Sequence, residues 1–169
     1  SRNQEGAGIY APILCQTGFL EDSRVLVCPT SALAEDDVFQ VPTLQDLKTA
    51  DARKLRKLRR LMGGSYGYTI GYVEYGRYLP PRNLERPFHP VVADSPSLHS
   101  TRFQSDNHGG FGQNVLFERG EVVFLKTTQL RGESDHLYTN KVGHVAPGVG
   151  PNDAVIGHST TVPVLYARQ

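Results

Sequence analysis

The chain has almost no net charge. Its 169 residues carry 18 Lys and Arg against 17 Asp and Glu, which leaves a formal charge of +1 when the six His are neutral. A protein that binds nucleic acid through its phosphates needs a clear cationic excess, and an acidic solvating tail needs the opposite. The composition therefore argues against both classes, and we expect no nucleic-acid partner.

Long apolar runs are missing as well. No stretch approaches the ~18–20 continuous apolar residues of a membrane span, and residues 1–8 lack the charged-then-apolar pattern of a secretion signal. If a membrane anchor belongs to this protein, we expect it upstream of Ser1. The length fits a single domain over residues 1–169 and leaves little room for two complete ones.

Cysteine is scarce. The chain has only Cys15 and Cys28, and two cysteines do not establish a redox compartment. In a reducing cell both would be small buried thiols. In an oxidising envelope a Cys15–Cys28 disulfide is possible, and the chain-entropy model gives it roughly 3 kcal/mol. The sequence leaves both alternatives open.

Glycine and proline, in contrast, make up about one residue in six, so helices should be few and loops many. The pattern predicts a short helix over 11–18 and a long helix over 44–62. Thr43 is the expected N-cap of the long helix, with Asp46 in its first turn. Six cations within 53–60 favour a solvated helix face, with contact to an acidic partner as the alternative.

Extended segments are expected at 24–28, 65–75, 91–93 and 162–166, with a polar loop over 77–87. The strongest pattern is a hairpin whose strands, 113–118 and 121–126, join at Arg119-Gly120. Because both of its faces are apolar, the strands should be central. The side chains expected to be mainly buried are Val115, Phe117, Val122 and Phe124.

These elements predict an α+β domain, loop-rich, with one long and one short helix packed on a mostly antiparallel sheet. Such a sheet offers one candidate chemistry, because Asp94, Asp106 and His108 could converge at its edge. Oxygen and imidazole ligands of this kind could hold a divalent ion for a metal-assisted hydrolase.

The residue spacing does not favour that hydrolase. The chain has no HExxH, no Cys-x-x-Cys and no Gly-x-Ser-x-Gly, and the glycines of 109–112 precede a strand rather than a helix. Asp94 and His108 are explained more simply as residues that hydrogen-bond to exposed loop backbone. We therefore expect no catalytic residue, no metal and no cofactor.

The segment 107–125, NHGGFGQNVLFERGEVVFL, resembles the family signature of planctomycete pilin-like proteins, in which a His and a spacer of about nine or ten residues precede Asp-Gly. Stretches at 19–30, 63–71, 90–94, 135–140 and 153–159 resemble the family too. The signature residues in this chain are Asp94, Asn107, His108, Gly109, Gly110, Asn114, Phe117 and Gly120.

The resemblance implies a type II secretion pseudopilin-like protein: an α+β head that normally follows an N-terminal membrane helix, located in the cell envelope. It implies a structural role in assembly or partner binding without a known reaction. Candidate contact surfaces are the loops 77–87 and 143–151. Arg119 stands where the family pattern has Asp, so we expect no tightly held ion at that turn.

Overall fold

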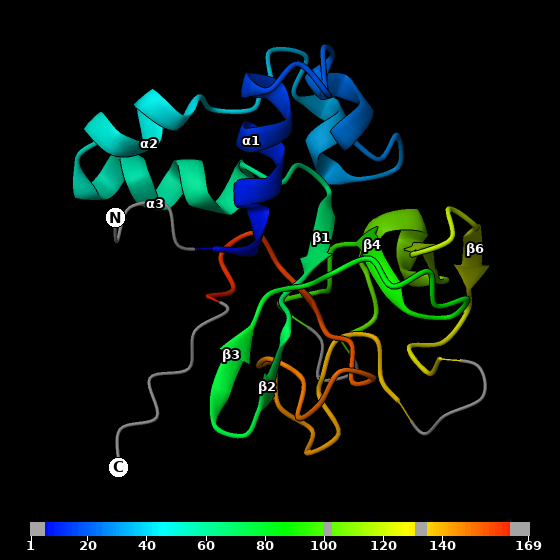
Figure 1. The fold of residues 1–169 in the computed structure, drawn as a ribbon. Coiled ribbons are helices and arrows are strands. Elements are labelled where there is room, and N and C mark those ends of the chain that lie inside the picture. Colours follow the sequence, from blue (N-terminus) through cyan, green and yellow to red (C-terminus); the bar gives the residue numbers. More distant parts are fainter. Residues whose placement is uncertain (1–5, 100–102, 131–134, 163–169) are drawn as a thin grey trace.

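A computed structural model describes residues 6–99, 103–130 and 135–162. It confirms the α+β class with a mostly antiparallel sheet. Figure 1 shows the helices gathered at one end of the molecule, above the strands and the long returning loops. Within the described residues, no helix has the length and apolar character needed to cross a membrane. The segment predicted at 162–166 lies almost wholly outside the described residues.

The predicted short helix is confirmed as α1, Tyr10–Gln16. Pro12 occupies its first turn, where a missing N–H costs nothing, and Gly18 follows its end with φ 76. The extended segment predicted at 24–28 is wrong, because Ser23–Leu26 forms a short 3-10 helix, η3. The Asp22 side chain accepts a hydrogen bond from the Arg24 backbone and so starts a helical turn there.

The segment 44–62 forms two helices rather than one, α2 at Leu44–Thr49 and α3 at Ala52–Leu61. Thr43 and Asp46 make the predicted cap, in which each side chain accepts a hydrogen bond from the other's backbone N–H. Asp51 then accepts hydrogen bonds from the Arg53 and Lys54 backbones, which makes it the N-cap of a second helix. The long helix was expected to continue because Asp51 was taken as an interruption of its apolar face.

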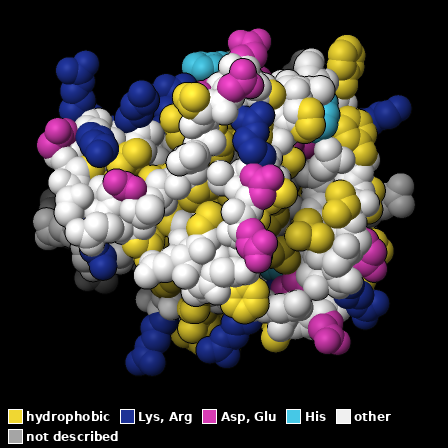
Figure 2. All heavy atoms as spheres, turned by 90° about the horizontal axis from the view of Figure 1, so that it is seen from above, with side chains coloured by type: hydrophobic (Ala, Val, Ile, Leu, Met, Phe, Trp, Pro, Cys, Tyr) yellow, Lys and Arg dark blue, Asp and Glu magenta, His cyan; other side chains and the backbone are white. Residues whose placement is uncertain are grey.

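The cations of α3 are mostly exposed to solvent, as a solvated face requires; only Arg59 is half-buried. Figure 2 looks down on the helices and shows Lys and Arg side chains that stand apart from one another. In this view they do not merge into one continuous patch.

The main sheet has the order β6-β5-β4-β1-β7, with antiparallel pairing throughout. Its strands are β1 Tyr66–Thr69, β4 Pro90–Asp94, β5 Gln113–Phe117, β6 Val122–Leu125 and β7 Ile156–Gly157. A separate hairpin pairs β2 Tyr72–Glu74 with β3 Arg77–Leu79. The strand predicted over 65–75 is thus divided between two sheets, because the chain turns at Gly71 with φ 75. A Cβ at Gly71 would lie 2.4 Å from the Leu79 carbonyl oxygen.

The predicted hairpin is confirmed, with Gln113 opposite Leu125 and Leu116 opposite Val122. Its second strand, however, is the outermost strand of the sheet and not a central one. Val122 and Phe124 are 64% and 44% exposed, so the prediction that they are buried is wrong. Val115 and Phe117 are buried as expected.

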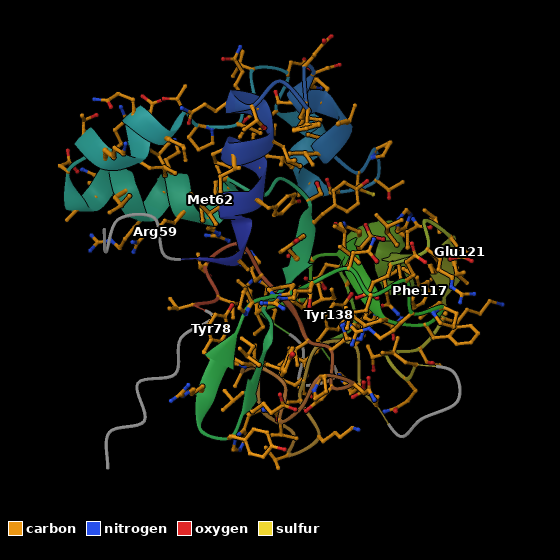
Figure 3. All side chains as sticks on the ribbon, in the orientation of Figure 1. Arg59, Met62, Tyr78, Phe117, Glu121 and Tyr138 are labelled. Carbon is orange, nitrogen blue, oxygen red and sulfur yellow. The ribbon has the colours of Figure 1, made fainter. Side chains whose placement is uncertain are left out.

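The core lies on the face of the sheet that carries Val115 and Phe117, where the segment leading into β7 returns and covers it. Its buried residues are Ala93, Val115, Phe117, Leu130, Leu137, Tyr138 and Ile156. In Figure 3, Phe117 and Tyr138 lie inside the molecule, whereas Glu121 lies at its outer margin. The first and last described segments also meet, since the Ala7 N–H donates to the Thr161 carbonyl.

The loop predicted over 77–87 begins as β3, and the rest of it is fastened to the hairpin turn by Glu118. The Glu118 carboxylate accepts hydrogen bonds from the Leu84 and Arg86 backbones and forms an ion pair of 2.5 Å with the Arg86 guanidinium. Burial raises the pKa of Glu118, but the hydrogen bonds and charge of Arg86 outweigh burial and lower this pKa to about 2. This loop is therefore less free than its composition suggests.

Replacing Phe117 with Ala should lower the free energy of unfolding by about 3–5 kcal/mol, because the side chain fills the core. Val122→Ala, in the same hairpin but exposed, should change the free energy of unfolding by no more than about 0.5 kcal/mol. Urea denaturation of both variants measures the difference. Equal losses would contradict the placement of β6 at the sheet edge.

Candidate functional site

Three side chains of different chemistry meet beside the end of β4. The Sγ of Cys28, a carboxylate oxygen of Asp94 and the Nε2 of His108 all lie within 4.8 Å of one another. His108 Nε2 is 3.1 Å from Asp94 Oδ2 and 3.5 Å from Cys28 Sγ. We call these three residues the Cys-Asp-His cluster.

Asp94 is the last residue of β4, and its side chain is completely buried. A buried carboxylate needs hydrogen bonds or an opposite charge to replace its lost hydration. Its Oδ2 accepts from the Asn114 backbone at 2.6 Å, and its Oδ1 accepts from the Asn107 side-chain amide at 2.8 Å. Tyr138 donates its hydroxyl to the Asp94 carbonyl at 2.8 Å. The carboxylate is therefore held by both neighbouring segments.

His108 lies in the short 3-10 segment η5, Asn107–Gly110, with a left-handed backbone at φ 55. Its Nδ1 is 3.1 Å from the Thr30 hydroxyl, which also accepts a hydrogen bond from the His108 backbone. The Phe124 ring meets the imidazole edge to face, with 5.7 Å between ring centroids. These contacts hold Nε2 toward the buried members of the cluster.

Cys28 approaches from the segment that follows η3 and is almost completely buried. Its Sγ lies 3.3 Å from the Thr30 hydroxyl. Solvent reaches the cluster through His108, whose side chain is 25% exposed while that of Asp94 is not exposed.

The predicted trio Asp94, Asp106 and His108 is assembled only in part. Asp94 and His108 come together as expected, but Asp106 is exposed and lies outside the cluster. The third member is Cys28, which the analysis of spacing missed. Cys28 and His108 are separated by 80 positions in the chain, so no local pattern could have joined them. The prediction that Asp94 bonds to exposed loop backbone is right about the backbone donor and wrong about the exposure.

The signature residues fall into two groups. Asp94, Asn107, His108 and Asn114 surround one site, in which the Asn114 side-chain nitrogen is 3.0 Å from His108 Nε2. Phe117 belongs to the core instead. Gly109 and Gly110, with φ 65 and 76, allow the left-handed turn after His108.

Gly120 and Arg119 lie at the far end of the hairpin from this site. Arg119 donates its Nε to the Glu85 carbonyl at 2.6 Å. The strand β5 separates the Arg119 turn from Asn114, and its residues each rise roughly 3.3 Å. The charge of Arg119 therefore has little influence on the Cys-Asp-His cluster, contrary to the weight given to it in the sequence.

The cluster does not have the geometry of a nucleophilic triad. In such a triad one imidazole nitrogen accepts the proton of the nucleophile while the other nitrogen bonds to the orienting carboxylate. Here Nε2 alone faces both the Cys28 sulfur and the Asp94 carboxylate, and Nδ1 faces Thr30. The arrangement offers instead one sulfur, one nitrogen and one oxygen donor around a common point.

Both cysteines are free thiols in the structure, so the alternative of a Cys15–Cys28 disulfide is not the state described here. Cys15 lies on α1 and is half-buried, and burial raises the pKa of its thiol. In the native protein, Cys15 should react with a thiol reagent faster than the buried Cys28. Thiol counting in unreduced, denatured protein should give two, and fewer than two would restore the disulfide.

A second titratable pair lies in the returning segment, where Asp135 and Asp153 are both buried. Asp153 Oδ2 accepts hydrogen bonds from the Lys141 and Val149 backbones, at 3.1 and 2.7 Å. Burial and the neighbouring Asp153 carboxylate raise the pKa of Asp135 to about 6, against the smaller opposing effect of Lys141.

This pair predicts a pH dependence of stability. The folded-state pKa of Asp135 lies above its unfolded value of about 3.9, so protonation favours the fold. The contribution should be fully present below about pH 4, decline as the pH rises to about 6, and be absent above that. Asp135→Asn should stabilise the protein above pH 6 and remove this decline, as measured by urea denaturation at several pH values. The exposed control Asp106→Asn should retain it, and destabilisation by Asp135→Asn at pH 8 would contradict the assignment.

Compared with protein-family models, with curated proteins and with solved structures, the chain has no significant match.

Proposed function

We propose that this protein is a non-catalytic assembly domain, the head of a pseudopilin-like protein of the cell envelope, and that it associates with a second copy through the outer edge of β6. The envelope setting and the pseudopilin-like role come from the resemblance of the segment 107–125. The contact itself is argued from the structure. The observation that carries it is the open, apolar edge of the sheet.

The outer edge of β6 has unused backbone groups. Phe117 donates its N–H to the Glu121 carbonyl, so residues 121, 123 and 125 direct their backbone polar groups toward β5. Those of Val122 and Phe124 point outward, where the described residues supply no further strand. An added strand could hydrogen-bond to them by β-augmentation.

The side chains at this edge are unusually apolar for an exposed position. Val122, Val123 and Phe124 are all exposed, and Phe111 nearby in sequence is 80% exposed. Soluble proteins normally protect an edge strand with a charge, a proline or a bulge, and β6 has none of these between Val122 and Leu125. Figure 2 shows apolar side chains gathered on the right of the molecule, the side on which β6 lies in Figure 1. A stable contact needs roughly 1,000 Å² or more, so it must extend beyond the strand itself.

The loops expected to make contacts from their sequence are weaker candidates. The loop after β3 is fastened by Glu118 and Arg86. In the loop 143–151, residues 146–148 are buried, and Val145 and Val149 are exposed apart from one another. The metal-assisted hydrolase is also less well supported, because Asp106 does not join Asp94 and His108.

Val122→Lys should weaken self-association at least tenfold, about 1.4 kcal/mol, because it places a charge in the middle of the contact edge. Val149→Lys is the matched control: it puts the same change on an exposed valine of the loop 143–151 and should leave association unchanged. Sedimentation equilibrium over a range of concentrations measures both. A wild-type chain that stays monomeric at high concentration would refute the homomeric contact, and a loss of association only in Val149→Lys would move the contact to the loop.

A further inference from the structure

We propose that the Cys-Asp-His cluster binds one Zn²⁺ ion through Cys28 Sγ, Asp94 Oδ2 and His108 Nε2. This site is independent of the assembly role proposed above. It also differs from the Asp94, Asp106 and His108 site considered from the sequence, because a thiolate replaces the second carboxylate.

The spacing of the donor atoms fits a tetrahedral zinc centre. Zinc bonds of about 2.3 Å to sulfur, 2.05 Å to nitrogen and 2.1 Å to oxygen place neighbouring ligands about 3.5 Å apart for sulfur and nitrogen, and about 3.4 Å for nitrogen and oxygen. The observed separations are 3.5 Å for Cys28 Sγ and His108 Nε2, and 3.1 Å for His108 Nε2 and Asp94 Oδ2. All three atoms lie within 4.8 Å of one another, so small side-chain rotations complete the geometry.

The surroundings of the donors resemble those of metal ligands. A metal-binding histidine usually bonds through its second nitrogen to a neighbouring group that fixes the ring, and His108 does so through Nδ1 to the Thr30 hydroxyl. Asp94 is likewise oriented, by the Asn107 amide and the Asn114 backbone. Each donor is thus already aimed at the common point.

His108 Nε2 also has more polar neighbours than a neutral imidazole can satisfy. If Nε2 carries the proton it can donate to Asp94, but it then faces the Asn114 side-chain nitrogen, a donor, at 3.0 Å. If Nε2 carries a lone pair it accepts from Asn114, but it then faces a carboxylate oxygen at 3.1 Å. A cation between the donors removes this conflict, and rotation of the Asn114 amide would turn its oxygen toward the ion.

The donor set selects the type of ion. A thiolate and an imidazole favour zinc and similar transition metals over Ca²⁺ and Mg²⁺, which prefer oxygen ligands. Binding requires that the Cys28 thiol lose its proton, so uptake should release a proton and weaken in acid. Three protein ligands with access past His108 leave one coordination position for water or for Asn114.

The test uses the purified full chain, with Zn²⁺ titrated in competition with a chromophoric chelator. One ion should bind per chain, and Cys28→Ser or His108→Gln should weaken binding at least about 100-fold. Cys15→Ser and Asp106→Asn are matched controls, since they remove a thiol and a carboxylate outside the cluster and should bind as the wild type does.

Cobalt gives a direct readout of the ligands. Co²⁺ should produce a thiolate-to-cobalt charge-transfer band in the wild type and in Cys15→Ser, and this band should be missing in Cys28→Ser. Melting curves in chelator establish that Cys28→Ser folds, so that loss of the band is not loss of the fold. Zn²⁺ should raise the melting temperature of the wild type and of both control variants but not that of Cys28→Ser. No stoichiometric binding by the wild type, or equal binding by Cys28→Ser, would overturn the site.

Discussion

The buried carboxylate of Asp94 is the constraint on which this part of the structure depends. A carboxylate removed from water must be compensated by hydrogen bonds or by an opposite charge, and here the compensation comes from separate segments. The Asn114 backbone fixes the start of β5, the Asn107 amide fixes the loop before it, and Tyr138 attaches the returning segment to the same residue. The order of β4, the loop and β5 around one residue follows from satisfying that charge.

The cluster and the sheet edge are physically connected. Phe124 belongs to the exposed strand β6, yet its ring packs edge-on against His108. A partner strand on β6 would therefore lie close to the side of the cluster that solvent reaches. The opposite end of the hairpin is held differently, by the ion pair of Glu118 with Arg86, so each end of the hairpin is fixed by its own buried carboxylate.

Several elements were predictable because their signals are local. The cap formed by Thr43 and Asp46 begins α2, and the hairpin around Gly120 has the expected partners. Where a local signal had two meanings, the prediction failed. Asp51 looked like a charge inside one helix and is the cap that begins another, and the apolar residues of β6 looked like a central strand and form an edge. Strand position depends on which segments pair, and this is not encoded in alternation along one strand.

For the candidate site, the sequence by itself determined Asp94 at a strand end and His108 in a glycine-rich loop, because strand ends and turns have short-range signatures. The tertiary structure alone decided that Cys28 completes the cluster and that Asp106 does not. It also decided that Arg119 lies at the other end of the hairpin. The physical reason is that a cluster of three donors is set by strand pairing and by the hydrogen bonds of one buried carboxylate. Both of these join residues that are far apart along the chain.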